Sequence, residues 1–118
     1  IIVDMSPRTD DTPLGVVVMP CQPTRLDWQT TITQKPELEK TGLKVIEVIN
    51  RVDNRIKENR EFALARKKEG ALIVANRGIY QRTIGEGCTI FNPKANNIYG
   101  ASAARNEINL LLEAALNE

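Results

Sequence analysis

The chain has no histidine, few aromatic residues and only two cysteines. Without histidine, these 118 residues hold neither a Ser-His-Asp triad nor a Cys-His pair, which excludes histidine-dependent catalysis by them. Cys21 and Cys88 are far apart and lack CxxC spacing, so we expect reduced structural thiols rather than zinc ligands. We expect the isolated aromatic residues Trp28, Tyr80 and Phe91 to pack in the core.

The sequence also lacks a charge bias and a long apolar run. Sixteen Lys and Arg residues nearly balance fifteen Asp and Glu residues, so a contact with nucleic acid would need a local basic patch. No apolar run approaches the length of about eighteen residues that marks a membrane span, and no signal-peptide pattern is present. These features predict a cytoplasmic protein with no membrane partner.

Short runs rich in β-branched residues alternate with longer helix-compatible stretches. The strand candidates are residues 1–4, 15–20, 43–50 and 71–76, and the helix candidates are residues 26–41, 54–69 and 101–117. Apolar residues stand on nearly consecutive positions of the strands, which is typical of parallel strands covered on both faces. The alternation predicts an α/β fold with a mostly parallel sheet. Because residues 1–4 read as the middle of a buried strand, we expect residues 1–118 to form a single partial domain.

Punctuating residues predict where the helices end. Asn54 is the expected N-cap of the second helix, and Gly42 and Gly70 stand where C-terminal glycines belong. Pro36 is expected to bend or split the first helix. Residues 87–100 are rich in Asn, Pro and Gly and predict a loop.

Polar residues follow each apolar run, at the carboxyl ends of strands where α/β sheets collect their ligands. Asp4 has two possible roles: it could hold Mg²⁺ through water, or it could be an ordinary aspartate at the end of a strand. Asn50 offers a paired donor and acceptor that match the adenine edge, but Asn50-Arg51-Val52-Asp53 also suits a turn. The residues alone leave both alternatives open.

The order of the motifs adds a family resemblance. The segments IIVDMSP, GVVVMPCQPTRLDW, LKVIEVINRVDNR, ALIVANRGIYQRTIGEG and ARNEINLLLEAAL together resemble the C-terminal half of the ParA/MinD-type P-loop (deviant Walker) partition ATPases. The resemblance covers nearly the whole chain, and its most specific part is V-x-P-x-Q-P-[ST]-x-x-D. It implies a three-layer P-loop NTPase-like fold. It also implies a homodimer that closes on ATP and opens on hydrolysis, releasing DNA or a partition-partner protein.

The resemblance implies roles for individual residues. Asp4 corresponds to the Walker B aspartate, a catalytic residue that holds Mg²⁺ through water. The implied nucleotide-binding residues are Pro20, Gln22, Asn50 and Arg51. The implied switch and dimer residues are Ser6, Pro7, Asp27, Arg77 and Tyr80, of which Arg77 and Tyr80 match an R-x-x-Y before a helix that Gly87 closes.

The chain departs from the family in two ways. The 118 residues contain no G-K-G-G-x-G-K-[ST] phosphate loop, so we expect them not to hydrolyse ATP alone, and ATP and Mg²⁺ are the cofactors of a larger parent. The stretch between Asp4 and Pro20 is short, which indicates an abbreviated switch or a divergent branch such as plasmid-stability or conjugation-associated relatives.

Two questions stay open at the level of sequence. The segment 54–69 carries basic residues mixed with Glu58, Glu61 and Glu69, which is typical either of a DNA contact or of a solvated face. These basic residues are Arg55, Lys57, Arg60, Arg66, Lys67 and Lys68.

The second question is the class of protein. The alternatives to a partition ATPase are a degenerate, non-catalytic adaptor and an unrelated flavodoxin-like or Rossmann-like domain, although G-x-G-x-x-G is absent.

Overall fold

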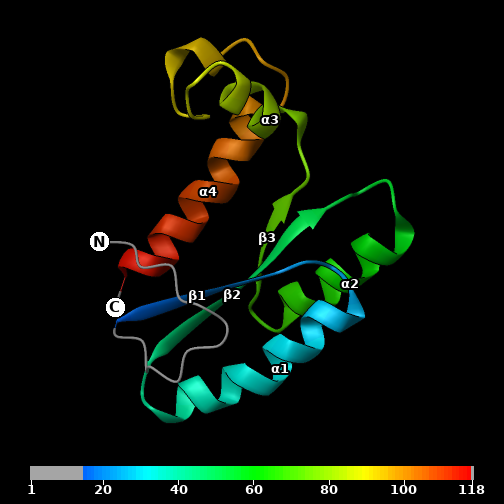
Figure 1. Cartoon of the computed structure of the whole chain (residues 1–118), viewed down its shortest axis with the longest axis vertical. Coiled ribbons are helices and arrows are strands. Elements are labelled where there is room, and N and C mark those ends of the chain that lie inside the picture. The colour runs from blue at the N-terminus through cyan, green and yellow to red at the C-terminus, as the bar shows by residue number, and fades with distance from the viewer. Residues whose placement is uncertain (1–14, 118) are drawn as a thin grey trace.

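The computed structural model describes residues 15–117, which form an α/β domain (Figure 1). The elements in chain order are β1 (Val16–Cys21), α1 (Arg25–Lys40), β2 (Lys44–Val52), α2 (Lys57–Lys68), β3 (Leu72–Ala75), α3 (Gly78–Gly85), a 3₁₀ turn (Pro93–Ala95) and α4 (Ala101–Leu116). The strands form a parallel sheet in the order β1-β2-β3. The predicted α/β class and parallel pairing are therefore confirmed. The strand expected at 1–4 lies outside the described residues.

Helices lie on both faces of this sheet, which gives three layers (Figure 1), although Val16 and Val18 of the edge strand β1 stay exposed. On one face α1 and α2 contribute Trp28, Phe62 and Ala63 to a cluster with Ile49 and Val52. On the other face α4 packs its apolar side on the opposite side chains of β2 and β3, through Ile108, Leu111, Ala114 and Ala115. Because both faces are covered, β2 is buried on four consecutive positions, 46–49.

A β-bulge interrupts β2 just before its end. Ile49 pairs with Ile73, but the next paired residues are Val52 and Ala75, so β2 contains one residue more than β3 between the two pairs. The extra residue returns Val52 to the face that Ile49 occupies, and both side chains lie in the same core cluster. The bulge contains Asn50 and Arg51, and it therefore decides how these two residues leave the sheet.

The helix ends agree with the sequence only in part. Gly42 and Gly70 follow α1 and α2 with φ of +84° and +100°, as expected of C-terminal glycines. The prediction that Asn54 caps the second helix is wrong, since α2 begins at Lys57 and no side chain caps it. Pro36, expected to bend or split the first helix, does not split it. Pro36 is exposed inside a continuous α1, where water can replace the hydrogen bond that proline cannot donate.

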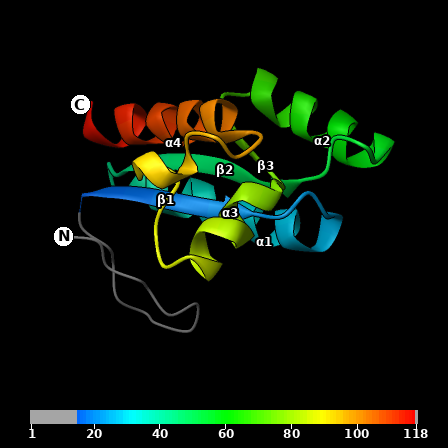
Figure 2. The same cartoon turned by 90° about the horizontal axis from the view of Figure 1, so that it is seen from above.

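The end of α4 lies beside the starts of β1 and β2 (Figure 2). Lys44 at the start of β2 holds this end, because its Nζ donates to the carbonyl oxygens of Ala114 at 2.6 Å and Asn117 at 2.5 Å. No helix within residues 15–117 combines the length and the apolar character that crossing a membrane requires.

The isolated aromatic residues and the cysteines have different surroundings. Trp28 and Tyr80 pack against core clusters as expected, whereas Phe91 is 45% exposed, so its assignment to the core is wrong. The loop that holds Phe91 contains only a 3₁₀ turn, as its composition predicts.

Both cysteines are free thiols, and burial raises the pKa of Cys21, which keeps this thiol protonated and unreactive.

Candidate functional site

A cleft of about 570 Å³ opens at the carboxyl ends of β2 and β3. Its lining includes Asn50 and Arg51 from the end of β2, and Asn76, Arg77 and Tyr80 from the segment that follows β3. The volume falls in the range of small-molecule sites, and the carboxyl ends of parallel strands are where such sites form. Four residues proposed for the nucleotide or the dimer, Asn50, Arg51, Arg77 and Tyr80, thus share this cleft, and Arg55, proposed for DNA, also lines it.

The bulge fixes the geometry of Asn50 and Arg51. The Asn50 side-chain oxygen accepts a hydrogen bond from the backbone N–H of Arg51 at 2.9 Å, which restrains the amide. Arg51 has φ of +55°, in the left-handed region, and is the one non-glycine residue of the described range with positive φ. The Arg51 side chain is exposed at the cleft, and the amide nitrogen of Asn50, which has no acceptor among residues 15–117, can donate to a ligand.

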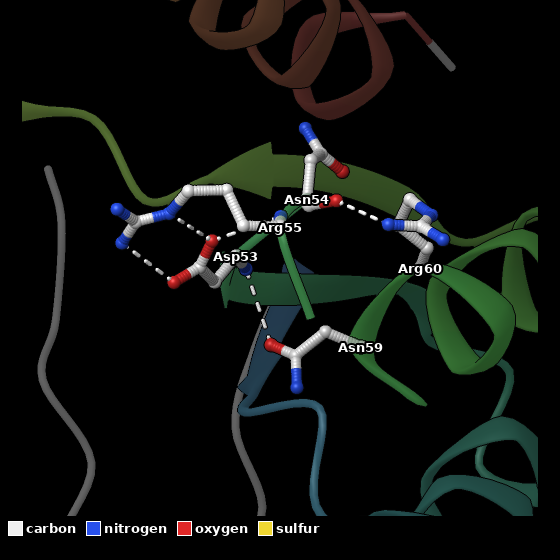
Figure 3. Close-up of polar contacts among 5 residues, drawn as sticks. All are labelled: Asp53, Asn54, Arg55, Asn59 and Arg60. Carbon is white, nitrogen blue, oxygen red and sulfur yellow. Dashed lines mark hydrogen bonds and ion pairs between the residues drawn. The ribbon is translucent and has the colours of Figure 1, made fainter. Parts of the chain in front are cut away.

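A hydrogen-bonded turn at residues 53–56 (Figure 3) contributes Asp53 and Arg55 to the lining of the cleft. The Asp53 carboxylate accepts from the backbone N–H of Arg55 at 3.0 Å and from the Arg55 guanidinium at 3.0 and 3.1 Å. Asn59 accepts the Asp53 N–H at 3.1 Å, and Arg60 donates to the Asn54 carbonyl oxygen at 2.7 Å. These bonds from Arg55 lower the pKa of Asp53, so its carboxylate is ionised and neutralises Arg55.

Arg77 at the other side of the cleft is held by α4. Its Nε donates to Glu107 Oε1 at 2.8 Å, while Glu107 Oε2 accepts the backbone N–H of Ala75 at 3.1 Å. The hydrogen bond to Glu107 raises the pKa of the Arg77 guanidinium. One carboxylate thus ties the end of β3 and a cleft arginine to α4.

Tyr80 lies in the first turn of α3, not before the helix as the R-x-x-Y pattern predicts, whereas Arg77 does precede the helix. Burial, followed by the negative charge of Glu107, raises the pKa of Tyr80. Its buried hydroxyl has no hydrogen-bond partner among residues 15–117. Gly87, with φ of +70°, closes α3 as expected.

The residues proposed around the end of β1 lie outside the cleft lining. Cys21 pairs with Ile49, so Gln22 and Asn50 leave neighbouring strands at the same edge of the sheet. Asp27 has a local structural role, because its carboxylate accepts the Gln22 N–H at 3.3 Å and its own N–H donates to the hydroxyl of the N-cap residue Thr24 at 3.4 Å. Pro20 lies in β1, within the strand predicted at 15–20.

Three proposed residues, Asp4, Ser6 and Pro7, lie outside the described residues. Within residues 15–117, no group of three or more His, Cys, Asp or Glu residues is arranged to hold a metal ion. The proposal of Mg²⁺ at Asp4 therefore stays a prediction.

The basic residues of segment 54–69 do not form a single basic surface. Arg55 precedes α2, and its guanidinium is paired with Asp53, while Lys57 pairs with Glu61 at 3.8 Å. Arg66 points inward, where it bonds Glu47 at 2.7 Å, so counting it among DNA contacts is wrong. Lys67 and Lys68 are exposed at the C-terminal end of the helix.

The cleft offers amide donors and acceptors, an exposed arginine and an apolar wall, which together suit a planar polar ligand with a negative charge. Sequence reasoning gave no role to Glu107, which positions Arg77 from 30 residues away. The only feature of the sequence that could have indicated this role is that Glu107 stands among the apolar residues of a helix. Comparisons with protein-family models, with curated proteins and with solved structures find no match to the chain.

Proposed function

We propose that the chain is part of a ParA-like, P-loop NTPase-type ATPase that acts in plasmid or chromosome partitioning or in plasmid stability. In this proposal the cleft receives the base of ATP. The Asn50 amide binds the adenine edge, Arg51 lies beside it, and Pro20 and Gln22 border the nucleotide from the neighbouring strand.

One observation carries the proposal: Asn50, Arg51, Arg77 and Tyr80 line a single cleft, although 30 residues separate the first from the last. The family resemblance selects these four residues from separate segments of sequence. Asn50 in particular has its amide restrained by the Arg51 N–H, and a restrained amide costs less entropy to engage with a base.

The remaining parts of the proposal concern the dimer and DNA. Asp4 would hold Mg²⁺ through water, and Ser6, Pro7, Asp27, Arg77 and Tyr80 would face a second subunit that docks when ATP binds. DNA would bind through lysines that have no anionic partner among residues 15–117, chiefly Lys67 and Lys68, with Lys57 and the turn at Arg55 and Arg60 as weaker contributors.

The test is equilibrium binding of ATP and GTP with Mg²⁺, together with the mass of the protein in solution with and without ATP. We expect tighter binding of ATP than of GTP, because guanine presents an acceptor where adenine presents the N6 donor. In a protein that carries the phosphate loop, we also expect ATP to convert monomers into dimers.

Equal affinity for ATP and GTP would contradict recognition of the adenine edge. Absence of any nucleotide binding would favour the alternative class, a non-catalytic adaptor that uses the same fold as a binding module. For DNA binding, replacing Lys67 and Lys68 with Ala should lower the slope of log K against log salt concentration by about 0.9 for each phosphate that the protein no longer neutralises. An unchanged slope would remove these lysines from the interface.

A further inference from the structure

The backbone of Arg51 is in a conformation that the fold alone does not favour in an arginine. Its φ of +55° brings Cβ close to neighbouring backbone atoms, whereas glycine adopts this conformation without that contact. The residue sits in the bulge between Ile49 and Val52, and bulges often redirect side chains beside functional sites. A requirement for the side chain would explain why arginine stands where glycine would be more stable.

Arg51 is also the cleft arginine whose charge is not neutralised within the described residues. The Arg55 guanidinium lies 3.0 Å from the Asp53 carboxylate, and Arg77 Nε lies 2.8 Å from Glu107. The exposed Arg51 guanidinium has neither an ion pair nor a hydrogen bond within residues 15–117. Among residues 15–117, Arg51 therefore gives the cleft one planar set of five N–H donors without an acceptor, beside the Asn50 amide.

We propose that Arg51 binds the phosphate groups of a phosphorylated small ligand in this cleft. A guanidinium matches phosphate oxygens with two parallel hydrogen bonds, which are stronger than bonds between neutral groups. The terminal nitrogens of Arg77, whose Nε alone bonds Glu107, supply a second donor group at the same cleft. The inference rests on the proposed function and extends it, since it names the cation that binds phosphates in a sequence without a phosphate loop. It does not require that Asn50 binds adenine.

The experiment compares three probes, ATP, adenosine and tripolyphosphate, by calorimetry at constant ionic strength. We expect ATP to bind about 10- to 100-fold more tightly than adenosine, as one charge-assisted contact predicts. The Arg51→Gly variant should bind ATP as weakly as adenosine while its Tm rises by a few degrees, because the backbone strain is relieved. Arg51→Lys, which keeps the charge but not the paired geometry, should retain part of the difference.

Lys40→Ala is the matched control, because it removes one exposed positive charge at the end of α1, beside the start of β2 and outside the cleft lining. It should leave the affinity for all three probes unchanged. If Lys40→Ala weakens ATP binding as much as Arg51→Gly does, the effect is general electrostatics and the proposal is overturned. It is also overturned if the wild type binds ATP no better than adenosine, or binds none of the probes.

The same probes separate this inference from the proposed function. Tripolyphosphate binding that is abolished in Arg51→Gly, without adenosine binding, supports the phosphate site and contradicts the adenine site. Adenosine binding with no gain from phosphates supports the adenine site and overturns the role of Arg51.

Discussion

Loss of either partner of the buried ion pair between Glu47 and Arg66 is expected to destabilise the protein strongly. Glu47 is 3% exposed in the middle of β2 and receives two hydrogen bonds of 2.7 Å from the Arg66 guanidinium on α2. Lys35 on α1 lies 3.6 Å from the same carboxylate, and the Arg66 guanidinium stacks 5.2 Å from the centre of the Trp28 ring. One carboxylate thus connects β2 with both helices on its face of the sheet.

Replacing Arg66 with Met leaves the Glu47 carboxylate buried with Lys35 as its remaining cation. Removal of one partner from a buried pair costs about 3–5 kcal/mol, and Lys35 places this case near the lower end, at about 3 kcal/mol. The cation–π interaction with Trp28 adds about 1 kcal/mol to this cost. The double variant Glu47→Leu with Arg66→Met removes both charges and should recover most of the stability, to within about 1 kcal/mol of wild type.

Urea unfolding followed by fluorescence measures this directly, because Trp28 is the only tryptophan and it packs against Phe62 and Arg66. Lys57→Met is the control, since the Lys57–Glu61 pair is exposed and should contribute less than about 0.5 kcal/mol. The reasoning is refuted if Arg66→Met costs less than about 1 kcal/mol, or if the double variant is no more stable than the single one.

The same pair predicts how stability depends on pH. Burial alone raises the pKa of Glu47, but the hydrogen bonds and charge of Arg66, with Lys35, outweigh it and hold the pKa below its ordinary value. Ionised Glu47 therefore stabilises the fold above the unfolded-chain pKa of about 4.3, and this contribution is lost as the pH falls through the lower folded value. Below about pH 4.3 the wild type should lose stability more steeply than the double variant, and parallel pH profiles would contradict this.

Three further predictions concern single positions. Gly70→Ala should destabilise the protein by about 1 kcal/mol in urea, because φ of +100° disfavours a Cβ although no atom lies within 4 Å of it, and a neutral result would show that the helix end adapts. Glu107→Ala should cost about 1–3 kcal/mol, since it leaves the Ala75 N–H and the Arg77 guanidinium without their acceptor, and a cost under about 0.5 kcal/mol by the same assay would contradict this role. Tyr80→Phe should leave stability unchanged or raise it by about 1 kcal/mol, because the buried hydroxyl has no partner among residues 15–117, and a clear loss would reveal a hydrogen bond to that hydroxyl.

The strands were predictable because a parallel sheet covered on both faces needs apolar residues at nearly every position. The apolar runs at 15–20, 43–50 and 71–76 each form a strand, but the expected burial on both faces holds for β2, whose positions 46–49 are all buried, and not for the edge strand β1, which leaves Val16 and Val18 exposed. The start of α2 was not predictable, since Asp53 and Asn54 can either cap a helix or form a turn. The turn forms because Arg55, Asn59 and Arg60 each bond to it, and those bonds depend on the final geometry.

The candidate site was predictable only where polar residues directly follow strands. Asn50, Arg51 and Arg77 could be identified in this way because the carboxyl ends of parallel strands meet at one edge. The positions of Arg66 and Glu107 could not, because each depends on which helix packs on which strand. In the sequence Arg66 is one charge of a solvated helix, and only the fold brings its partner, 19 residues earlier in β2, opposite it.

The central claim, that Asn50 binds the base of ATP, is tested most directly by the Kd for ATP of Asn50→Asp. This variant keeps the oxygen that accepts the Arg51 N–H, so the bulge is preserved, but it replaces the amide donor with a negative charge. The account predicts a Kd for ATP about 5- to 150-fold weaker than in the wild type, the change that corresponds to about 1–3 kcal/mol, with an unchanged Tm. An unchanged Kd in a folded Asn50→Asp protein would contradict the claim and remove Asn50 from the site.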